Sequence, residues 1–188
     1  ENKGIDYLLV AFFILKKKYD NLKLILKDQS NLFKIHASQY LSKMKKSKYS
    51  NLLNDKNIKD VILISKNLSV SDLNNLYNVA DCYASPYRAE GFNLTPLEAA
   101  SSGTPIIVTK GGSTDDYFDN CLGLQIDSKQ IKNKNKSMLE PNIDSLIENI
   151  LKIKMKKIKF DKEKAQDYLL KNYTWKKITG QILDVISK

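Results

Sequence analysis

The sequence has few of the residues that build metal centres and disulfide frameworks. Its 188 residues include one histidine (His36), two cysteines and a single arginine, Arg88. The cysteines, Cys82 and Cys121, do not form a CxxC pair and cannot make a disulfide framework, so we expect reduced thiols in a cytoplasmic protein. The sequence shows no clustered pattern of metal-ligating residue types, and we interpret His36 as a surface residue.

Long apolar runs and an N-terminal targeting signal are also missing. The longest apolar run, Tyr7 to Leu15, is far shorter than the roughly 20 residues that a membrane-spanning helix needs. The chain begins with Glu1 rather than Met, and residues 1–3 do not lead into a signal-peptide hydrophobic region. We therefore expect a single domain cut from a longer protein, because 188 residues with 42% hydrophobic content can form one buried core.

Positive charge is abundant but unevenly placed. The formal net charge is +10, yet residues 61–128 carry three basic and eight acidic side chains between two lysine-rich flanks. A nucleic-acid-binding protein is expected to place basic groups beside its most distinctive residues, and here that segment is acidic, so we expect no nucleic acid partner. The lysines are most simply solvated helix faces, with a polyanion site as the alternative. Five lysines within 152–159 follow an apolar stripe over 143–151, which is most simply core; contact with an anionic membrane is the alternative.

Short apolar runs alternate with helical periodicities along the chain. Alternation at this spacing predicts an α/β protein with a Rossmann-like parallel sheet flanked by helices, in one domain over residues 1–188. We expect residues 129–137, which have no apolar period, to form an exposed loop. The expected strands cover residues 22–26, 61–64, 81–85, 105–109 and 122–126, and the expected helices 5–15, 37–53, 69–80, 95–102, 143–155, 161–172 and 175–186.

The segment between the third strand and the next helix contains the residues best suited to chemistry. Ligands of open α/β sheets bind beyond the carboxyl ends of the strands, which is where this loop is expected. Glu90 precedes the helix and Glu98 lies in its first turn, so their carboxylates can flank a ligand and accept hydrogen bonds from sugar hydroxyls. The helix start offers backbone N–H groups to a phosphate or polyol oxygen, and Gly91 permits close approach or an unusual backbone angle.

A purely structural interpretation of part of this segment stays open. Thr95-Pro96-Leu97-Glu98 is a good capping box, with Thr95 as the N-cap, proline at the first helical position and Glu98 bonding back to the cap. Glu90 has no comparable structural explanation, because it precedes the cap. From the spacing alone we favour a helix cap as the role of Glu98, with a ligand contact as the alternative.

The same segment resembles the Glu-x7-Glu signature of retaining, family-4-type glycosyltransferases (glycosyl transferases group 1), which have the GT-B fold. The match runs from Glu90-Gly91-Phe92 through Pro96-Leu97-Glu98-Ala99 to Gly103-Thr104-Pro105, and further matches lie at Lys3-Gly4, Ala80-Asp81, Lys110-Gly111-Gly112 and Tyr173-Thr174-Trp175. The resemblance covers nearly the whole chain. It implies the C-terminal, donor-binding half of a GT-B enzyme.

The resemblance also implies a role for each matched residue. Glu90 would be the catalytic residue, in contact with the transferred sugar, and Glu98 would bind the ribose hydroxyls of the sugar nucleotide. Lys3 would neutralise the diphosphate. The other donor-binding residues would be Gly91, Phe92, Asn93, Leu94 and Thr95, through backbone amides and the Thr95 hydroxyl, and the base would lie against Ser65, Lys66, Asn67 and Leu68. No metal or other cofactor is implied.

The activity implied is transfer of a sugar from a UDP- or GDP-sugar to an acceptor hydroxyl with retention. The N-terminal acceptor domain, the family's phosphate-binding arginine and its first, central strand would precede Glu1. We therefore expect an interrupted sheet and no turnover by this chain alone. The expected partners are a sugar nucleotide, the N-terminal GT-B domain and an unidentified acceptor, in the cytoplasm or at the membrane periphery. The alternative is a non-catalytic sugar-nucleotide or polyanion binding module of a larger protein.

Overall fold

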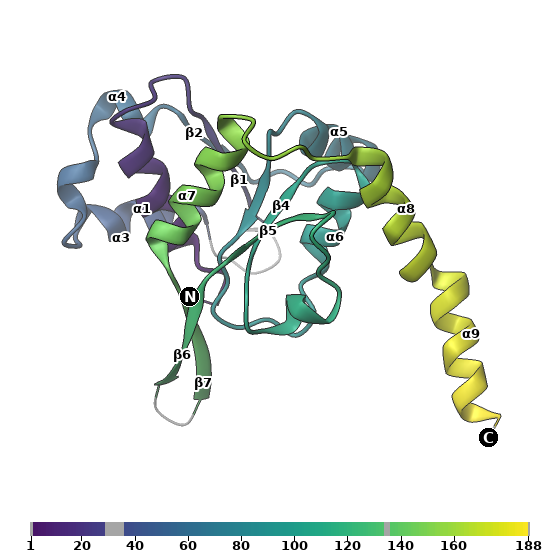
Figure 1. Ribbon diagram of the computed structural model, residues 1–188. Helices are drawn as coiled ribbons and strands as arrows, with labels where there is room; N and C mark the ends of the chain where they lie inside the picture. The colour runs from purple at the N-terminus through teal and green to yellow at the C-terminus, as the bar shows by residue number, and fades with distance from the viewer. Residues whose placement is uncertain (1, 29–35, 134–135, 188) are drawn as a thin grey trace.

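The computed structural model describes residues 2–28, 36–133 and 136–187 (Figure 1). Strands and helices alternate over most of the chain, as the sequence predicted, and helices follow one another at its C-terminal end. In chain order the elements are α1 (Ile5–Lys16), β1 (Leu24–Lys27), α3 (Ser38–Lys45), η1 (Ser50–Leu52), α4 (Asp55–Ile58), β2 (Val61–Ile64), α5 (Val70–Asn78), β3 (Tyr83–Ser85), α6 (Leu94–Ser101), β4 (Ile106–Thr109), η2 (Ser113–Asp116), β5 (Gly123–Ile126), β6 (Ser128–Asn133), β7 (Lys136–Pro141), α7 (Ile143–Lys154), α8 (Lys162–Asn172) and α9 (Trp175–Ile186).

Five of the strands form two parallel sheets, which confirms the predicted α/β class. β1 pairs with β2, in a register that sets Leu24 opposite Val61. β4 lies between β3 and β5, with Ile107 opposite Ala84 on one side and Leu124 on the other. Within the described parts of the chain no ladder joins β1 to β3. The sheet is therefore interrupted, as expected if the family's first, central strand is not part of this chain.

Helix α1 connects the two sheets through its side chains. Its sequence is apolar on nearly all sides, so the helix is stable only when it is surrounded by protein, and eight of its residues are buried. Part of α1 packs in one cluster with Leu26 of β1, Met44 of α3 and Leu52 of η1. Ala11 packs in another cluster with Ile107 of β4 and with α7. Side chains of α1 thus enter the cores on both sides of the interruption.

The apolar stripe of α7 belongs to this core. Leu146 is fully buried, and Ile143, Ile147 and Ile150 pack around the cluster that contains it. The simpler interpretation of the stripe is confirmed, and these side chains cannot also lie on a membrane surface. In the part of the chain that the structure describes, no helix has both the length and the apolar character needed to cross a membrane.

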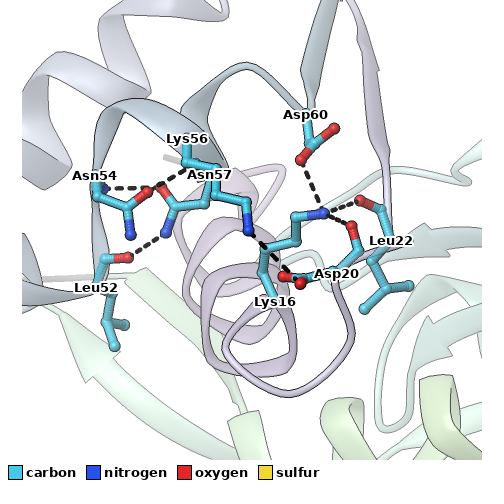
Figure 2. Close-up of polar contacts among 8 residues, drawn as sticks. All are labelled: Lys16, Asp20, Leu22, Leu52, Asn54, Lys56, Asn57 and Asp60. Atoms are coloured by element: carbon cyan, nitrogen blue, oxygen red, sulfur yellow. Dashed lines mark hydrogen bonds and ion pairs between the residues drawn. The ribbon is translucent and has the colours of Figure 1, made fainter.

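A buried lysine ties the last turn of α1 to the strands (Figure 2). The Lys16 side chain is 3% exposed, and its Nζ lies 2.8 Å from Oδ2 of Asp60. The same ammonium donates to the carbonyl oxygen of Leu22 at 3.0 Å and to that of Asp20. These oxygens compensate for the removal of the charge from water. Because Asp20 and Leu22 lead into β1 and Asp60 precedes β2, the contacts fix where both strands begin.

Residues 129–133 and 136–137 lie in two paired strands, not in the exposed loop that the sequence predicted, and residues 134–135 lie outside the described residues. β6 and β7 pair antiparallel, with Gln130 opposite Leu139, and Figure 1 shows them projecting from the body of the protein. The prediction was wrong because strands with solvent on both faces need no apolar period. Leu139 is buried, and its amide donates to the Arg88 carbonyl at 2.8 Å. The base of the hairpin therefore contacts the loop that contains Glu90.

The C-terminal helices begin at capping residues that the sequence contains. Asp161 accepts a hydrogen bond from the amide of Lys164 at the start of α8, and Thr174 accepts one from the amide of Lys177 at the start of α9. α8 packs against α6 through Ala165 and other residues of the second core cluster. α9 has no buried residue and extends away from the body (Figure 1).

Candidate active site

Buried side chains hold the start of the loop after β3. Ser85, Pro86 and Tyr87 are all buried. Tyr87 Oη lies 2.9 Å from the hydroxyl oxygen of Thr114 and accepts a hydrogen bond from the Thr114 amide at 3.1 Å. A Cβ on Gly112 would lie 2.7 Å from Tyr87 Oη, so glycine is required beside the ring. The glycine-containing segment after β4 therefore supports the loop.

The N-terminal segment lies directly against the same loop. Gly4 has φ +65°, and a Cβ on it would lie 1.7 Å from the Pro86 carbonyl oxygen. The amides of Arg88 and Ala89 donate to the Asn2 carbonyl at 2.6 and 3.4 Å. Glycine alone combines a positive φ with so close an approach at no steric cost. The glycine before α1 thus allows two segments that are distant in the sequence to meet.

This approach brings Lys3 and Glu90 together. Lys3 Nζ lies 2.6 Å from Glu90 Oε1, and the two side chains are 60% and 13% exposed. Oε1 is buried, and its partner among the described residues is the Lys3 ammonium. A carboxylate oxygen has more than one lone pair, so it can accept a further donor beside this ammonium. The arrangement suits a ligand that brings a hydroxyl to this oxygen.

Helix α6 begins at Leu94, with Asn93 rather than Thr95 at its N-cap. Asn93 has φ 63° and ψ 67°, and its side chain does not cap the helix. Instead, the side-chain nitrogen Nδ2 of Asn93 donates to Ser85 Oγ at 3.0 Å. The predicted capping box of Thr95 and Glu98 was wrong, because Thr95 already lies inside the helix. With no side-chain cap, the first backbone N–H groups of α6 can bind an anion or a polyol oxygen.

Gly91 does not have the unusual backbone angle that the sequence suggested. Its φ is not positive, and the left-handed residue of the loop is Asn93. A Cβ on Gly91 would meet no protein atom within 4 Å among the described residues. Phe92 and Leu94 are 41% and 62% exposed, and the Phe92 ring lies 5.3 Å from that of Tyr117. The outer face of the loop is therefore apolar and accessible.

A partly buried tyrosine, Tyr83, lies near both glutamates. Tyr83 Oη donates a hydrogen bond to Thr95 Oγ1 at 3.0 Å. If the Thr95 hydroxyl also binds the sugar nucleotide, it does so while it accepts this bond from Tyr83. Burial raises the pKa of Tyr83, the bond to Thr95 opposes this shift, and the charges of Glu98 and Glu90 raise the pKa further. Two carboxylates can shift the pKa of one phenol only if both lie within electrostatic range of it. Glu90 and Glu98 therefore both lie within electrostatic range of the Tyr83 hydroxyl.

Glu98 lies on the exposed side of α6, where α5 orients it. Tyr77 of α5 donates from Oη to Glu98 Oε2 at 3.0 Å, and no described residue donates to Oε1. Burial raises the pKa of Tyr77, and the neighbouring Tyr83 and the Glu98 carboxylate raise it further, so Tyr77 remains a hydrogen-bond donor. One oxygen of Glu98 is thus fixed by the protein and the other is open to donors from outside.

The residues expected to hold the base lie in the loop after β2. Ser65 donates from Oγ to Asp28 Oδ2 at 3.2 Å, which links the ends of β2 and β1. Residues 66–68 are exposed or half-buried. No hydrogen bond or ion pair between described residues joins this loop to Glu90 or Glu98. The structure brings the predicted base residues to the carboxyl edge of their own sheet, but not into contact with the glutamates.

Several neighbours of the site were not predicted from the sequence. Tyr77 and Tyr83 were assigned to a helix stripe and a strand, where tyrosine is most simply core. Arg88 forms an ion pair with Asp6. The sequence indicated Arg88 only by its position, because the one arginine of the chain lies two residues before Glu90. Within the described ranges, no group of three or more His, Cys, Asp or Glu side chains is placed to hold a metal ion.

Comparison with known proteins shows the family to which the chain belongs. Residues 1–159 match the family described as glycosyl transferases group 1. The chain belongs to this family. This glycosyltransferase domain is 31% identical over 111 residues to the mannosylfructose-phosphate synthase of Agrobacterium fabrum, an alignment that covers 59% of the chain and 23% of that protein. The chain spans between 14% and 37% of the lengths of the curated relatives it matches.

Solved structures of glycosyltransferases share its fold. The C-terminal domain of the group 1 protein LpcC from Francisella tularensis superposes with a TM-score of 0.62 at 20% identity, covering 93% of this chain and 81% of that one. TarM of S. aureus, solved as a point mutant in complex with fondaparinux, alpha-GlcNAc-glycerol and UDP, superposes with a TM-score of 0.68 at 20% identity, covering 100% and 34%. The glycosyltransferase domain therefore has the architecture of a GT-B C-terminal domain.

Proposed function

We propose that this chain is the donor-binding part of an enzyme that transfers a sugar from a UDP- or GDP-sugar to an acceptor hydroxyl with retention. The Lys3–Glu90 pair is the observation on which the proposal depends, because it places an ammonium that is 60% exposed beside a largely buried carboxylate at the loop after β3. Membership of the family supports sugar transfer. The UDP in the TarM structure supports a nucleotide as the ligand.

In this proposal Glu90 faces the reacting end of the donor. A hydroxyl of the transferred sugar donates to the Glu90 carboxylate beside the Lys3 ammonium. When the bond to the diphosphate breaks, the anomeric centre gains positive charge, as in other reactions at that carbon. A carboxylate already in place stabilises this charge without reorganising at the moment of reaction.

Lys3 and the start of α6 receive the diphosphate. The Lys3 side chain is 60% exposed, so its ammonium can approach a phosphate while it stays near Glu90. The N-terminal turn of α6 has no side-chain cap and offers the amides of residues 93–95 together with the positive end of the helix dipole. Both groups act on a leaving group that gains negative charge, and in this scheme no metal or other cofactor is needed.

The nucleoside lies farther along the carboxyl edge. Glu98, with Oε2 held by Tyr77, accepts hydrogen bonds from the ribose hydroxyls through Oε1. Residues 65–68 contact the base. An N-terminal GT-B domain supplies the facing wall of the acceptor site, so the chain alone binds the donor but does not turn it over. The protein works in the cytoplasm, and its lysine-rich faces would make any contact with an anionic membrane periphery.

Calorimetric titration of the chain with UDP, GDP and a single-stranded oligonucleotide tests this function. We expect one of the nucleotides to bind and the oligonucleotide not to bind. Lys3→Ala should weaken nucleotide binding about tenfold or more, because a charge-assisted contact is lost. Lys171→Ala, on the exposed face of α8, is the matched control and should bind as the unchanged chain does. Binding of the oligonucleotide but of neither nucleotide would support the polyanion module and reject the donor site.

A further inference from the structure

A groove of about 710 Å³ lies next to the segments that contain Lys3 and Glu90. Its walls come from the first turns of α1, from residues 40–49, from the base of the β6–β7 hairpin and from the start of α7. Figure 1 shows α1, α3 and α7 on the left side of the molecule, with the β6–β7 hairpin extending below them. The volume is in the range of small-molecule sites, roughly 300–1,000 Å³. Neither Glu98 nor residues 65–68 line the groove, so it is separate from the proposed nucleoside contacts.

Carboxylates and cations line the groove in equal number. The carboxylates are Asp6, Asp127, Glu140 and Asp144, and the cations are Lys43, Lys48, Arg88 and Lys129. A ligand with a net charge of either sign would meet like charges on these walls, which disfavours it. A neutral ligand with many hydroxyls can donate to the carboxylates and accept from the lysines at the same time.

Tyrosine rings form the less polar part of the wall. Three tyrosines line the groove, and each has a cation near its ring: Arg88 at 4.4 Å from the centroid of Tyr7, Lys43 at 5.7 Å from Tyr40 and Lys48 at 5.1 Å from Tyr49. Burial raises the pKa of Tyr7, the charge of Arg88 opposes the shift, and Glu140 of the hairpin adds to it, so Glu140 and Tyr7 face the same space. Rings and hydroxyls together suit a ligand with both C–H faces and polar edges.

Asp6 and Arg88 join the groove to the candidate active site. Both residues line the groove. Asp6 follows Lys3 by three residues, and Arg88 precedes Glu90 by two. A ligand in the groove would therefore lie next to the pair that faces the reacting sugar in the proposed function.

We propose that this groove binds a neutral saccharide and holds it as the acceptor-side ligand, an inference that rests on the proposed function. The balance of charge, the tyrosine rings and the continuity with Glu90 all favour an uncharged, hydroxyl-rich molecule. The donor nucleotide and the saccharide then occupy neighbouring but distinct parts of the chain, and both can bind at once.

Two-dimensional ¹H–¹⁵N NMR of the chain tests this proposal. The probes are the neutral disaccharides maltose, lactose and mannobiose, glucose 6-phosphate as a charged counterpart, and UDP in a separate titration. We expect at least one disaccharide to shift the amides of residues 6–10, 127–129, 140 and 142–144, with the same affinity in the presence of UDP. UDP should shift the amides at the start of α6.

Carboxylate variants in the groove sharpen the test. Asp127→Asn and Glu140→Gln should each weaken disaccharide binding about three- to tenfold, because each removes a charged acceptor of a hydroxyl. Glu148→Gln, on the exposed face of α7 and outside the groove, is the matched control and should leave binding unchanged. None of the three should alter UDP binding.

The outcomes separate this proposal from the proposed function. Binding of UDP without binding of any disaccharide would overturn the groove proposal and leave the donor site intact. Binding of glucose 6-phosphate alone, or of a disaccharide that UDP displaces, would also overturn it. Disaccharide binding in the groove without any UDP binding would instead support the groove and reject the donor site.

Discussion

Arg88 and Asp6 form a two-pronged ion pair that joins the Glu90 loop to the first turn of α1. Arg88 Nη1 donates to Asp6 Oδ1 at 2.8 Å, and Nη2 donates to Oδ2. Burial of Asp6 raises its pKa, but the hydrogen bonds and charge of Arg88 outweigh this effect and hold the pKa below its ordinary value. The pair lies beside the backbone contacts of Asn2 with the loop, so it helps to hold Lys3 against Glu90.

Breaking this pair should loosen the proposed donor site. We expect Asp6→Asn to lower the free energy of unfolding by about 1 kcal/mol or less, because Asp6 is 54% exposed and solvent screens the pair. UDP affinity should fall several-fold. Since the pKa of Asp6 is lowered in the folded state, the lost stability is largest at neutral pH and disappears as the pH falls through that pKa. Denaturant unfolding at several pH values measures it.

A charge swap provides the control for that experiment. The double variant Asp6→Arg with Arg88→Asp should recover part of the UDP affinity that each single variant loses. Arg88→Lys should bind UDP more weakly than the unchanged chain, because a lysine cannot make two parallel hydrogen bonds to the Asp6 carboxylate. Equal UDP affinity in the unchanged chain, the two single charge-reversal variants and the double variant would show that the pair has no influence on the site.

Gly4→Ala should disturb the approach of the N-terminal segment to the loop. The new Cβ would lie 1.7 Å from the Pro86 carbonyl oxygen at φ +65°. A left-handed alanine alone costs about 1–2 kcal/mol, and the clash adds to it. Gly180→Ala is the matched control, because a Cβ there meets nothing within 4 Å in α9, and it should stabilise the chain by about 0.5–1 kcal/mol. Thermal unfolding of the two variants would contradict this account if it showed equal stability.

Glu98→Gln distinguishes ribose binding from a structural role. Glutamine can still accept the hydrogen bond from Tyr77, so we expect a stability change well under ~1 kcal/mol. Nucleotide affinity should fall about ten- to a hundredfold, which corresponds to the loss of a charged acceptor worth about 1.5–3 kcal/mol. Glu163→Gln, an acidic residue in the first turn of α8, should change neither property. Unchanged UDP affinity in folded Glu98→Gln would exclude the ribose contact.

Lys16→Met should destabilise the junction of α1 with β1 and β2. The variant leaves the carbonyls of Asp20 and Leu22 without this donor, at an expected cost of about 1–3 kcal/mol. The hydrogen bond from Lys16 holds the pKa of Asp60 below 3.8, so the variant should raise that pKa toward 3.8 in an NMR titration. Lys17→Met, at the exposed neighbouring position, should change stability by less than about 0.5 kcal/mol.

Most of the fold follows from local patterns, and most of the site does not. Strands such as Val61–Ile64 were predictable because a run of β-branched and aliphatic residues suits a parallel strand. The pairing of β6 with β7 was missed, because these polar strands have no apolar period that would mark them in the sequence. The start of α6 was misplaced, because Asn93 takes a left-handed conformation stabilised by Ser85, a tertiary partner.

The residues of the site illustrate the same limit. Glu90 and Glu98 were predicted from their spacing and from the resemblance. Their partners were not, because 82 residues separate Arg88 from Asp6 and 21 separate Glu98 from Tyr77. Contacts over such separations are set by how the elements pack, and a single sequence holds no direct signal for them.

The interruption between β1 and β3 has a consequence for how the protein opens. Strands within one ladder exchange their amide protons as a cooperative unit, whereas sheets joined only through side chains can open separately. Here the coupling passes through the apolar packing of α1, which enters both cores. We expect the amides of β1 and β2 to exchange with deuterium on a different timescale from those of β3, β4 and β5. Substitutions that replace buried apolar side chains of α1 by smaller ones should increase the difference between these exchange rates. One half of the protein could then unfold while the half with Glu90 and Glu98 stays folded.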